Sequence, residues 1–275
     1  MKNLIVGPGL ILLAVVTSSP VLADDAPPLD DRFTLQLGGY LVSTDTTVRV
    51  DGSSGEGTEF DWEGKTGTGD ADRFRVDALW RITPRHRLRL MYFDNQRDGQ
   101  RAIEEEIEFQ GETYPVGAVL EARSDFEILQ VAYEYAFLSR EDYEVAASIG
   151  IHNVDMSFGL RAEATIDGEP IGSGEIDESA STSGPLPVLG LRGIWRFADK
   201  CYLDGHAQFF ALEFDNYDGE VIDAQASVIW QAFRHVGIGL GYNWFDARLD
   251  VEGDRLDGRL EWGYDGLMLF ARASF

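Results

Sequence analysis

The chain has 275 residues, of which 23 are Lys or Arg and 48 are Asp or Glu, so its formal net charge at pH 7 is -25. This acidity excludes a nucleic-acid-binding protein, because such a protein needs a basic face to neutralise phosphates. Hydrophobic residues make up 44% of the chain, and the only long apolar stretch is at the N-terminus, which excludes a disordered chain and a protein with several transmembrane helices.

The N-terminal residues predict a secretory signal peptide. Lys2 supplies the positive start, residues 4–16 supply the apolar run, and Val21-Leu22-Ala23 supplies a cleavage site of small residues. A retained anchor is the weaker alternative, because an acidic and Pro-rich stretch follows at once. We therefore expect a signal peptide at residues 1–23, a short periplasmic segment at 24–31 and a folded domain at 32–275.

The rest of the chain alternates apolar and polar residues with the two-residue period of β-strands. Every second residue from Phe74 to Ile82 is apolar, whereas Arg73, Arg75 and Asp77 occupy alternate positions. The pattern recurs and predicts about ten strands, at residues 32–50, 72–82, 87–100, 120–138, 142–160, 185–197, 201–214, 220–233, 236–250 and 257–275.

The connections between these strands alternate between short and long. Short turns fall at 83–86, 138–142, 198–200 and 234–235, whereas 51–70, 101–119 and 164–184 are long and rich in Gly, Ser and acidic residues. This asymmetry is typical of outer-membrane barrels, whose short turns face the periplasm. The sequence therefore predicts an all-β fold: an antiparallel transmembrane β-barrel of about ten strands in the outer membrane of a Gram-negative bacterium, in contact with its lipid and lipopolysaccharide.

Local sequences strengthen this interpretation. The last strand ends in Phe275, and a terminal aromatic resembles the signal by which the barrel-insertion machinery recognises outer-membrane proteins. Phe60-Asp61-Trp62-Glu63, Asp72-Arg73-Phe74-Arg75 and the run from Ile82 to Leu88 resemble proteobacterial barrels of the broad OmpA-like and OmpW-like set. The resemblance implies the fold and the location and leaves the function open.

The polar face of the predicted strands faces the lumen. Arg makes up most of its basic residues, and the planar guanidinium suits pairing with carboxylates. These charges either form a closed polar core or line a narrow path for a small polar or charged solute. The lumen-lining candidates are Arg73, Arg75, Asp77, Arg81, Arg89, Glu134, Arg192, Arg196, Asp204, His206, Asp223 and Arg272.

The sequence gives little support for an enzymatic function. Omptin proteases are ten-stranded barrels with paired acids and an Asp-x-His element, and this chain contains Asp70-Ala71-Asp72 and Asp204-Gly205-His206. The second element follows a short periplasmic turn, however, so we expect it about a membrane thickness from the first. Ser148 and His152 share a strand face at about 13 Å, which is too far apart for a Ser/His hydrolase.

The outer loops carry acidic residues, which would attract divalent cations that also bridge lipopolysaccharide, or would keep the loops soluble. Residues 164–184 contain five acidic residues and no Lys or Arg, and residues 103–122 predict a paired ribbon that extends beyond the membrane. Cys201 is the only cysteine, so a disulfide within the chain and a multi-cysteine metal site are excluded, and we expect no metal site and no cofactor.

We expect a non-enzymatic protein that is structural or passes a small polar solute. The alternatives are an outer-membrane hydrolase that acts on lipid or peptide, and an adhesin or receptor that binds through its loops.

Overall fold

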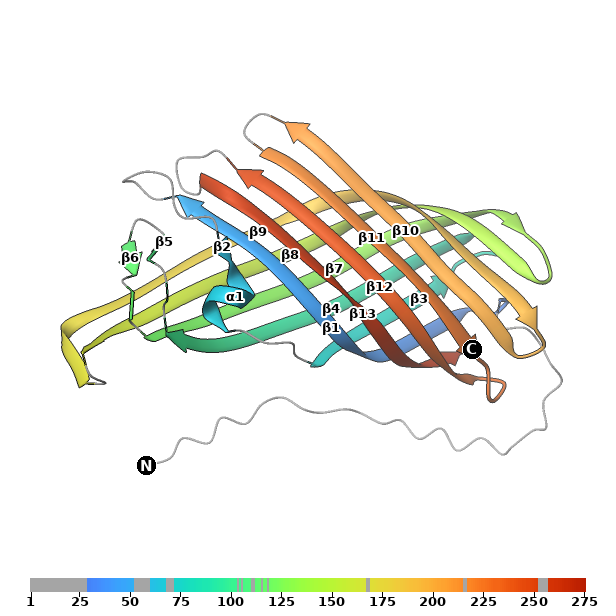
Figure 1. Ribbon diagram of the computed structural model, residues 1–275. Helices are drawn as coiled ribbons and strands as arrows, with labels where there is room; N and C mark the ends of the chain where they lie inside the picture. The colour runs from blue at the N-terminus through green and yellow to red at the C-terminus, as the bar shows by residue number, and fades with distance from the viewer. Residues whose placement is uncertain are drawn as a thin grey trace, which may run out of the picture.

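The computed structural model describes residues 29–51, 60–67, 72–102, 104, 106–109, 112–114, 116–117, 119–166, 169–214, 217–251 and 257–275. These residues form a closed antiparallel barrel (Figure 1). The predicted signal peptide lies outside the described residues. The barrel strands are β1 (Phe33–Asp51), β3 (Asp72–Arg81), β4 (His86–Ala102), β7 (Val119–Ser139), β8 (Tyr143–Ile166), β9 (Glu169–Ala198), β10 (Cys201–Phe214), β11 (Tyr217–Trp230), β12 (Val236–Val251) and β13 (Asp257–Ser274).

The first and last barrel strands close the wall. Each strand pairs with its neighbour in the chain, and β1 pairs with β13 from Thr34–Ser274 to Asp51–Asp257. At the periplasmic end, the Phe275 carbonyl accepts hydrogen bonds from the amides of Arg32 (2.6 Å) and Phe33 (2.9 Å). The barrel wall therefore has no free edge at this seam, as a membrane-spanning sheet requires.

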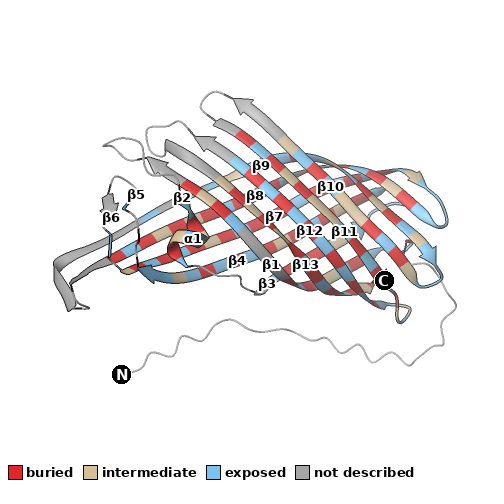
Figure 2. Ribbon diagram, viewed as in Figure 1, coloured by how far each residue is buried: buried red, intermediate tan, exposed pale blue. Residues whose placement is uncertain are grey.

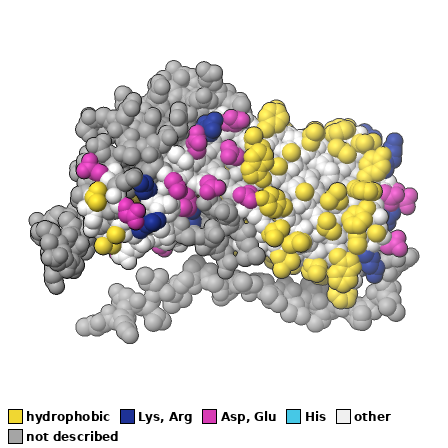
Figure 3. All heavy atoms as spheres, viewed as in Figure 1, with side chains coloured by type: hydrophobic (Ala, Val, Ile, Leu, Met, Phe, Trp, Pro, Cys, Tyr) yellow, Lys and Arg dark blue, Asp and Glu magenta, His cyan; other side chains and the backbone are white. Residues whose placement is uncertain are grey.

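Buried and exposed residues alternate along the strands, so the wall has an inner and an outer face (Figure 2). The exposed apolar side chains form a belt at the periplasmic half of the wall (Figure 3). On β7 the belt runs from Leu129 to Phe137, about 26 Å along the strand, which at a tilt of about 40° matches most of an apolar band about 25 Å tall. The belt is a lipid-facing surface. The described part of the chain contains no helix long and apolar enough to cross a membrane.

The number of barrel strands and most of their positions agree with the sequence prediction. The predicted loop at 164–184 is wrong, because β8 and β9 stay paired as far as Ile166 and Glu169 (Figure 1, yellow). Gly, Ser and acidic residues favoured a loop there, but the hydrogen bonds of a strand pair join backbone groups and do not depend on apolar side chains. The predicted extension of the third and fourth strands beyond the membrane is confirmed, because β4 and β7 stay paired as far as Ala102 and Val119.

The small elements that follow β1 were not predicted. Strand β2 (Phe60–Asp61) pairs with β1, and the one-turn helix α1 (Trp62–Thr66) follows it. Within the ribbon predicted at 103–122, strands β5 (Ile107–Phe109) and β6 (Glu112–Tyr114) pair as a two-stranded hairpin that is separate from the barrel sheet. A single helical turn has too few residues to produce a recognisable 3.6-residue period, which explains why the sequence did not indicate α1.

An arginine placed in the belt tests the membrane boundary. Leu90 lies in the belt on β4, and Gln96 is exposed on the same face of that strand beyond the belt. We expect Leu90→Arg to lower the free energy of unfolding in lipid by about 2–4 kcal/mol and Gln96→Arg by about 0–1 kcal/mol. Urea unfolding in lipid vesicles measures both, and equal losses would contradict the assignment of the belt.

Candidate functional site: the filled lumen

A chain of alternating charges crosses the lumen in its periplasmic half. Each member comes from a different strand, and successive members approach to N–O distances of 3.7, 2.7, 4.0, 2.7 and 3.9 Å. We call this set the charge chain. It runs through Asp77 (β3), Arg89 (β4), Glu134 (β7), Arg192 (β9), Asp204 (β10) and Arg272 (β13).

The two short contacts in the charge chain are charge-assisted hydrogen bonds. Arg89 donates from Nε to Glu134 (2.7 Å), and Arg192 donates from Nη2 to Asp204 (2.7 Å). The side chains of all six members are at most 11% exposed. Charges buried to this degree persist only when they are paired, because removal from water costs several kcal/mol per ion. The charge chain thus fixes the positions of strands on opposite sides of the barrel.

A second polar network continues from Asp77 toward the extracellular side. Arg75 donates to both oxygens of Asp77 (2.7 and 3.0 Å), and its Nη1 also reaches the Tyr40 hydroxyl and Asn243. Asn243 donates to Asp223 (3.1 Å), whose other oxygen lies 3.3 Å from Nε2 of His206. This network joins β1, β3, β10, β11 and β12 across the lumen.

A third group of polar side chains faces the lumen from β7, β8 and β10. The Gln208 Oε1 atom accepts a hydrogen bond from Gln130 (2.7 Å) and lies 3.1 Å from Nε2 of His152. All three side chains are buried. The polar groups on this side therefore bond to one another across β7, β8 and β10.

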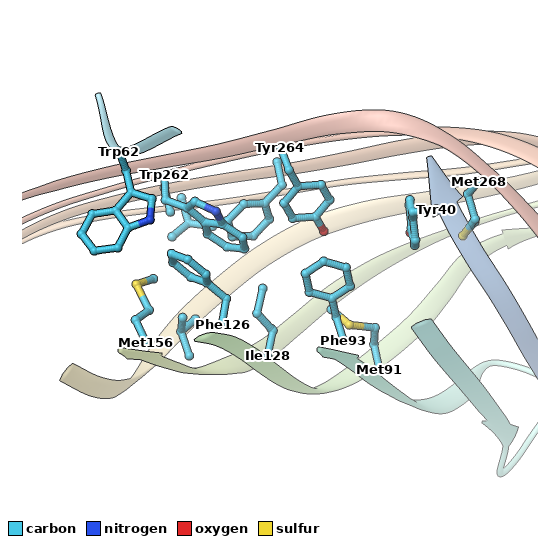
Figure 4. Packing of buried hydrophobic residues seen from close by; sticks show 14 of the residues in the cluster. Tyr40, Trp62, Met91, Phe93, Phe126, Ile128, Met156, Trp262, Tyr264 and Met268 are labelled. Atoms are coloured by element: carbon cyan, nitrogen blue, oxygen red, sulfur yellow. The ribbon is translucent and has the colours of Figure 1, made fainter. Parts of the chain in front are cut away.

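Above the polar networks, an aromatic cluster fills the lumen (Figure 4). Trp262 stacks on Phe126 with ring centroids 4.3 Å apart, and Phe245 stacks on Tyr264 at 5.2 Å. Phe93 also stacks on Tyr264, with ring centroids 5.0 Å apart. Aromatic pairs of this kind contribute about 0.5–1.5 kcal/mol each beyond their burial. The extracellular half of the lumen is therefore packed like a protein core.

Helix α1 covers this cluster. Trp62 is fully buried and meets Phe158 edge to face at 4.9 Å. The Glu63 carboxylate accepts hydrogen bonds from the Thr46 amide and hydroxyl (2.8 Å each) and pairs with Arg97. These contacts hold the helix in the mouth of the barrel, with Trp62 directed into the lumen (Figure 4).

The segment before β1 crosses the periplasmic mouth. Arg81 donates hydrogen bonds to the backbone carbonyls of Leu29 and Asp31. Arg234 donates two hydrogen bonds to the Asp31 carboxylate, at 3.1 and 2.9 Å. These hydrogen bonds raise the pKa of the Arg234 guanidinium above its ordinary value. We call residues 29–31 the periplasmic strap. Above it, Arg81 and Arg87 both pair with Glu144.

Most of the predicted lumen residues meet in these networks. The described side chains of Arg75, Asp77, Arg81, Arg89, Glu134, Arg192, Asp204, His206, Asp223 and Arg272 all take part in the contacts above. Arg196 instead lies at the periplasmic rim and bonds to Asp142 (3.0 Å from Nε). The Arg73 side chain lies outside the described residues. The role of these residues in a conduit stays a prediction.

Sequence reasoning missed several members of the lumen. Arg87 has the same parity on β4 as the predicted Arg89, which was the available signal. Tyr40 and Asn243 are buried on β1 and β12, for which the sequence analysis named no lumen residue. The aromatic cluster was missed because the apolar positions switch faces beyond the membrane. On β7 the inward positions turn apolar at Ile128 and Phe126, while the outward positions turn acidic.

The hollows described on the wall lie mainly among outward-facing residues. One of about 490 Å³ lies around Gly193, Gly205 and Ala226, and one of about 340 Å³ lies around Ala78. A third, of about 330 Å³, lies beside Glu127 just beyond the belt. Within the described part of the chain, no group of three or more His, Cys, Asp or Glu residues could hold a metal ion. The acidic positions predicted to bind cations at 167–178 have side chains outside the described residues.

The two acidic elements weighed for an omptin-like site are far apart. Asp70 is outside the described residues, and Asp72 pairs with Leu41 five residues along β3 from Asp77, about 17 Å at 3.3 Å per residue. Asp77 belongs to the charge chain, as does Asp204, which already pairs with Arg192. The two elements are therefore not brought together as a general acid and base would need.

Comparisons with known proteins show the fold. No protein-family model matches the chain, and no curated protein matches its sequence. The outer-membrane protease OmpT of Escherichia coli matches with a TM-score of 0.58 and 13% identity, over 90% of this chain and 97% of that one. The toluene transporter TodX of Pseudomonas putida gives 0.34 at 10% identity, over 91% of each chain. Neisserial surface protein A gives 0.29 at 11% identity, over 88% of this chain and 97% of that one.

At 13% identity, the match to OmpT shows the fold and no function. Together with the lipid-facing belt and the closed ten-stranded wall, this match shows that the chain has the outer-membrane barrel fold. Phe275 is exposed, and its backbone completes the seam with β1. Its role as an insertion signal stays a prediction.

Removal of one carboxylate tests the charge chain. Glu134→Gln leaves Arg89 and Arg192 without their shared anion, so we expect the free energy of unfolding to fall by about 3–5 kcal/mol. The control is Glu121→Gln, an exposed residue on the same strand that accepts one hydrogen bond from Gln100. We expect the control to change stability by at most about 0.5 kcal/mol. Denaturant unfolding in detergent measures both, and similar values for the two variants would refute the pairing.

Trypsin tests the periplasmic strap. Arg32 follows the strap directly, and cleavage there requires the strap to leave the mouth of the barrel. We expect Arg234→Gln, which releases Asp31, to speed cleavage after Arg32 at least several-fold. Arg85→Gln changes another periplasmic arginine whose side chain contacts only the Tyr135 hydroxyl, at 3.4 Å. Mass spectrometry follows the fragment, and equal rates in both variants would show that Asp31–Arg234 does not hold the strap.

Proposed function

We propose that this protein is a closed, non-enzymatic outer-membrane barrel that anchors an extracellular structure. The barrel supplies a stable membrane span, and the strands that continue beyond the belt form the displayed part. The proposal selects the structural alternative over the solute conduit. It extends beyond what the likeness to other barrels supports, which is the fold and the outer-membrane setting.

One observation carries the proposal: the described lumen is filled from the periplasmic strap to α1. The strap, the charge chain, the polar networks and the aromatic cluster follow one another along the barrel axis. A conduit needs polar groups that a passing solute can reach and leave. Here the charged groups are paired with one another, and the extracellular half is aromatic, which supports a packed interior instead.

The state of the acidic and histidine side chains supports the absence of catalysis. Asp204 pairs with Arg192, and His206 lies against Asp223 inside the packed interior. A general base needs access to a substrate proton at hydrogen-bond distance, directly or through one water. Among the described hollows, Asp204 borders one in the periplasmic half of the wall, beside Gly205, and none borders His206.

A receptor or adhesin is the second candidate, and the length of the β8–β9 hairpin favours it. The belt on β8 ends near Ile151, whereas pairing with β9 continues to Ile166. Fifteen further residues correspond to about 50 Å of strand, and β7 also pairs with this part of β8 as far as Glu163. A wall that continues this far beyond the belt, with the β8–β9 hairpin at its end (Figure 1), can hold a binding surface away from the membrane. Lipopolysaccharide and divalent cations remain proposed partners of this side of the molecule.

Planar-bilayer recordings test the closed state. We expect the refolded protein to insert without discrete conductance steps, because no member of the charge chain can leave its partners cheaply. A variant with Arg75 and Arg192 replaced by Ala removes two guanidiniums from the packed layers, and we expect it to produce steps or frequent openings. Steady conductance in the unaltered protein, with ion selectivity that shifts in this variant, would overturn the proposal and favour the conduit.

A further inference from the structure

The largest of the three hollows described above lies on the lipid-facing side of the wall, in the periplasmic half of the belt. Its volume is about 490 Å³, within the range of about 300–1,000 Å³ that is usual for ligand pockets. Two charged residues, Glu144 and Asp204, contribute to its lining, but their side chains turn into the lumen and pair there with arginines. The hollow itself is therefore apolar.

The floor of the hollow is formed by small residues on four adjacent strands. Gly193 on β9 lies opposite Val145 on β8 and opposite Gly205 on β10. Gly205 in turn lies opposite Ala226 on β11. All four belong to the outward-facing set of their strands. The hollow therefore runs across the wall from β8 to β11.

Larger side chains border the periplasmic side of this floor. Strand register places Trp195 opposite both Tyr143 and Leu203, and all three side chains are exposed. On the extracellular side, Leu191 continues the belt along β9. Because Trp and Tyr gather where the hydrocarbon of a membrane meets its headgroups, the floor lies just inside the periplasmic leaflet.

Packing within the chain does not explain the glycine at position 193. A Cβ atom at Gly205 would lie 3.0 Å from the Gln225 carbonyl oxygen, so the close approach of β11 accounts for that glycine. A Cβ atom at Gly193 would have one described neighbour within 4 Å, the Glu144 carbonyl oxygen at 3.9 Å, which is an ordinary contact. Glycine weakens a strand and often marks a place where a ligand approaches the backbone. The space at Gly193 is thus open to a group from outside the chain.

Two cationic side chains lie at the periplasmic rim below the hollow. Arg140 and Lys200 are exposed in the turns that lead into β8 and β10, at the same end of the barrel as the border of the hollow. No acid in the described part of the chain forms an ion pair with either of them. Glu141 and Asp199 stand beside them in the sequence. The rim therefore suits a headgroup that carries both a phosphate and an ammonium group.

A second copy of the chain would fill the hollow poorly. Two-fold dimers, the commonest oligomers, bring the same patch of both subunits together. Hollow would then face hollow, and atoms around the remaining space would lose their contacts. A flexible acyl chain can instead follow the floor between the bordering side chains.

We propose that the hollow binds one phospholipid of the periplasmic leaflet, with an acyl chain seated on the floor at Gly193 and the phosphate beside Arg140 and Lys200. The seated chain contacts more wall atoms than a chain on the flat part of the belt does, so this lipid stays bound when the surrounding bilayer is removed. The site goes beyond the anchoring function proposed above and does not depend on it.

Native mass spectrometry tests the floor of the site. The full chain is reconstituted in vesicles of phosphatidylethanolamine and phosphatidylglycerol and is then extracted into a mild detergent. We expect one phospholipid to remain on each barrel, and Gly193→Leu, which fills the hollow, to lower the bound fraction at least several-fold. Ala226→Leu fills the other end of the floor and replaces Gly193→Leu if that variant does not fold.

The matched control is Ala271→Leu, which adds the same side chain at an exposed position on β13, away from the hollow. We expect this control to keep the lipid. Absence of a retained phospholipid in the unaltered protein, or equal retention in the filled and control variants, would overturn the proposal. A lipid-free dimer that Gly193→Leu dissociates would also refute it, because the hollow would then be an interface between copies.

Rim variants test the headgroup contact in the same spectra. Replacement of both Arg140 and Lys200 by Gln removes the cations beside the phosphate, so we expect the bound fraction to fall several-fold. Arg85→Gln changes an exposed arginine in the turn between β3 and β4 and should leave the bound fraction unchanged. Equal retention in the double variant and in Arg85→Gln would contradict the phosphate contact.

Discussion

The buried pairing of guanidinium and carboxylate groups is the interaction on which this barrel depends. The hydrogen-bonded wall closes the sheet, but it does not determine what the wide interior contains. The charge chain does so, because each carboxylate holds arginines from different strands, and none of these charges is stable in the interior alone. This pairing is the basis on which we propose that the periplasmic half of the lumen is a polar core rather than a water-filled channel.

The membrane imposes a second constraint that reverses along each strand. Within the lipid belt the outer face must be apolar, so the polar residues face inward. Beyond the belt the outer face meets water, and the inner positions are free to be apolar. Strand β7 shows the reversal clearly: Val131 and Leu129 face lipid, whereas Glu127 and Asp125 occupy the next outer positions and Ile128 and Phe126 turn inward. The edge of the lipid belt therefore explains why the charge chain fills one half of the lumen and the aromatic cluster fills the other.

Much of the fold could be predicted from the sequence because the two-residue period is strong wherever lipid meets one face. The alternation from Phe74 to Ile82 predicted a strand in this way. It also predicted that Arg75 and Asp77 face the lumen. The β8–β9 extension was missed because residues 164–184 carry no regular alternation of apolar side chains that would reveal a strand. Helix α1 is too short to show a period.

Which inward residues contact one another could not be predicted from parity. Asp204 and Arg272 are 68 positions apart and come from strands separated by two others, so their approach depends on the diameter and stagger of the closed barrel. The sequence likewise identified His206 without identifying Asp223 as its neighbour. The geometry, not the residue type, favours a packed core over a conduit.

Thiol labelling at a lumen position tests the sealed interior most directly. Gln130 is buried and donates a hydrogen bond to Gln208, and Cys201 is the only native thiol. A Gln130→Cys variant in a Cys201→Ala background should resist a small charged thiol reagent added to either side of the folded barrel, and react only after unfolding. Rapid modification in the folded protein, from either side, would show an open lumen and contradict the account.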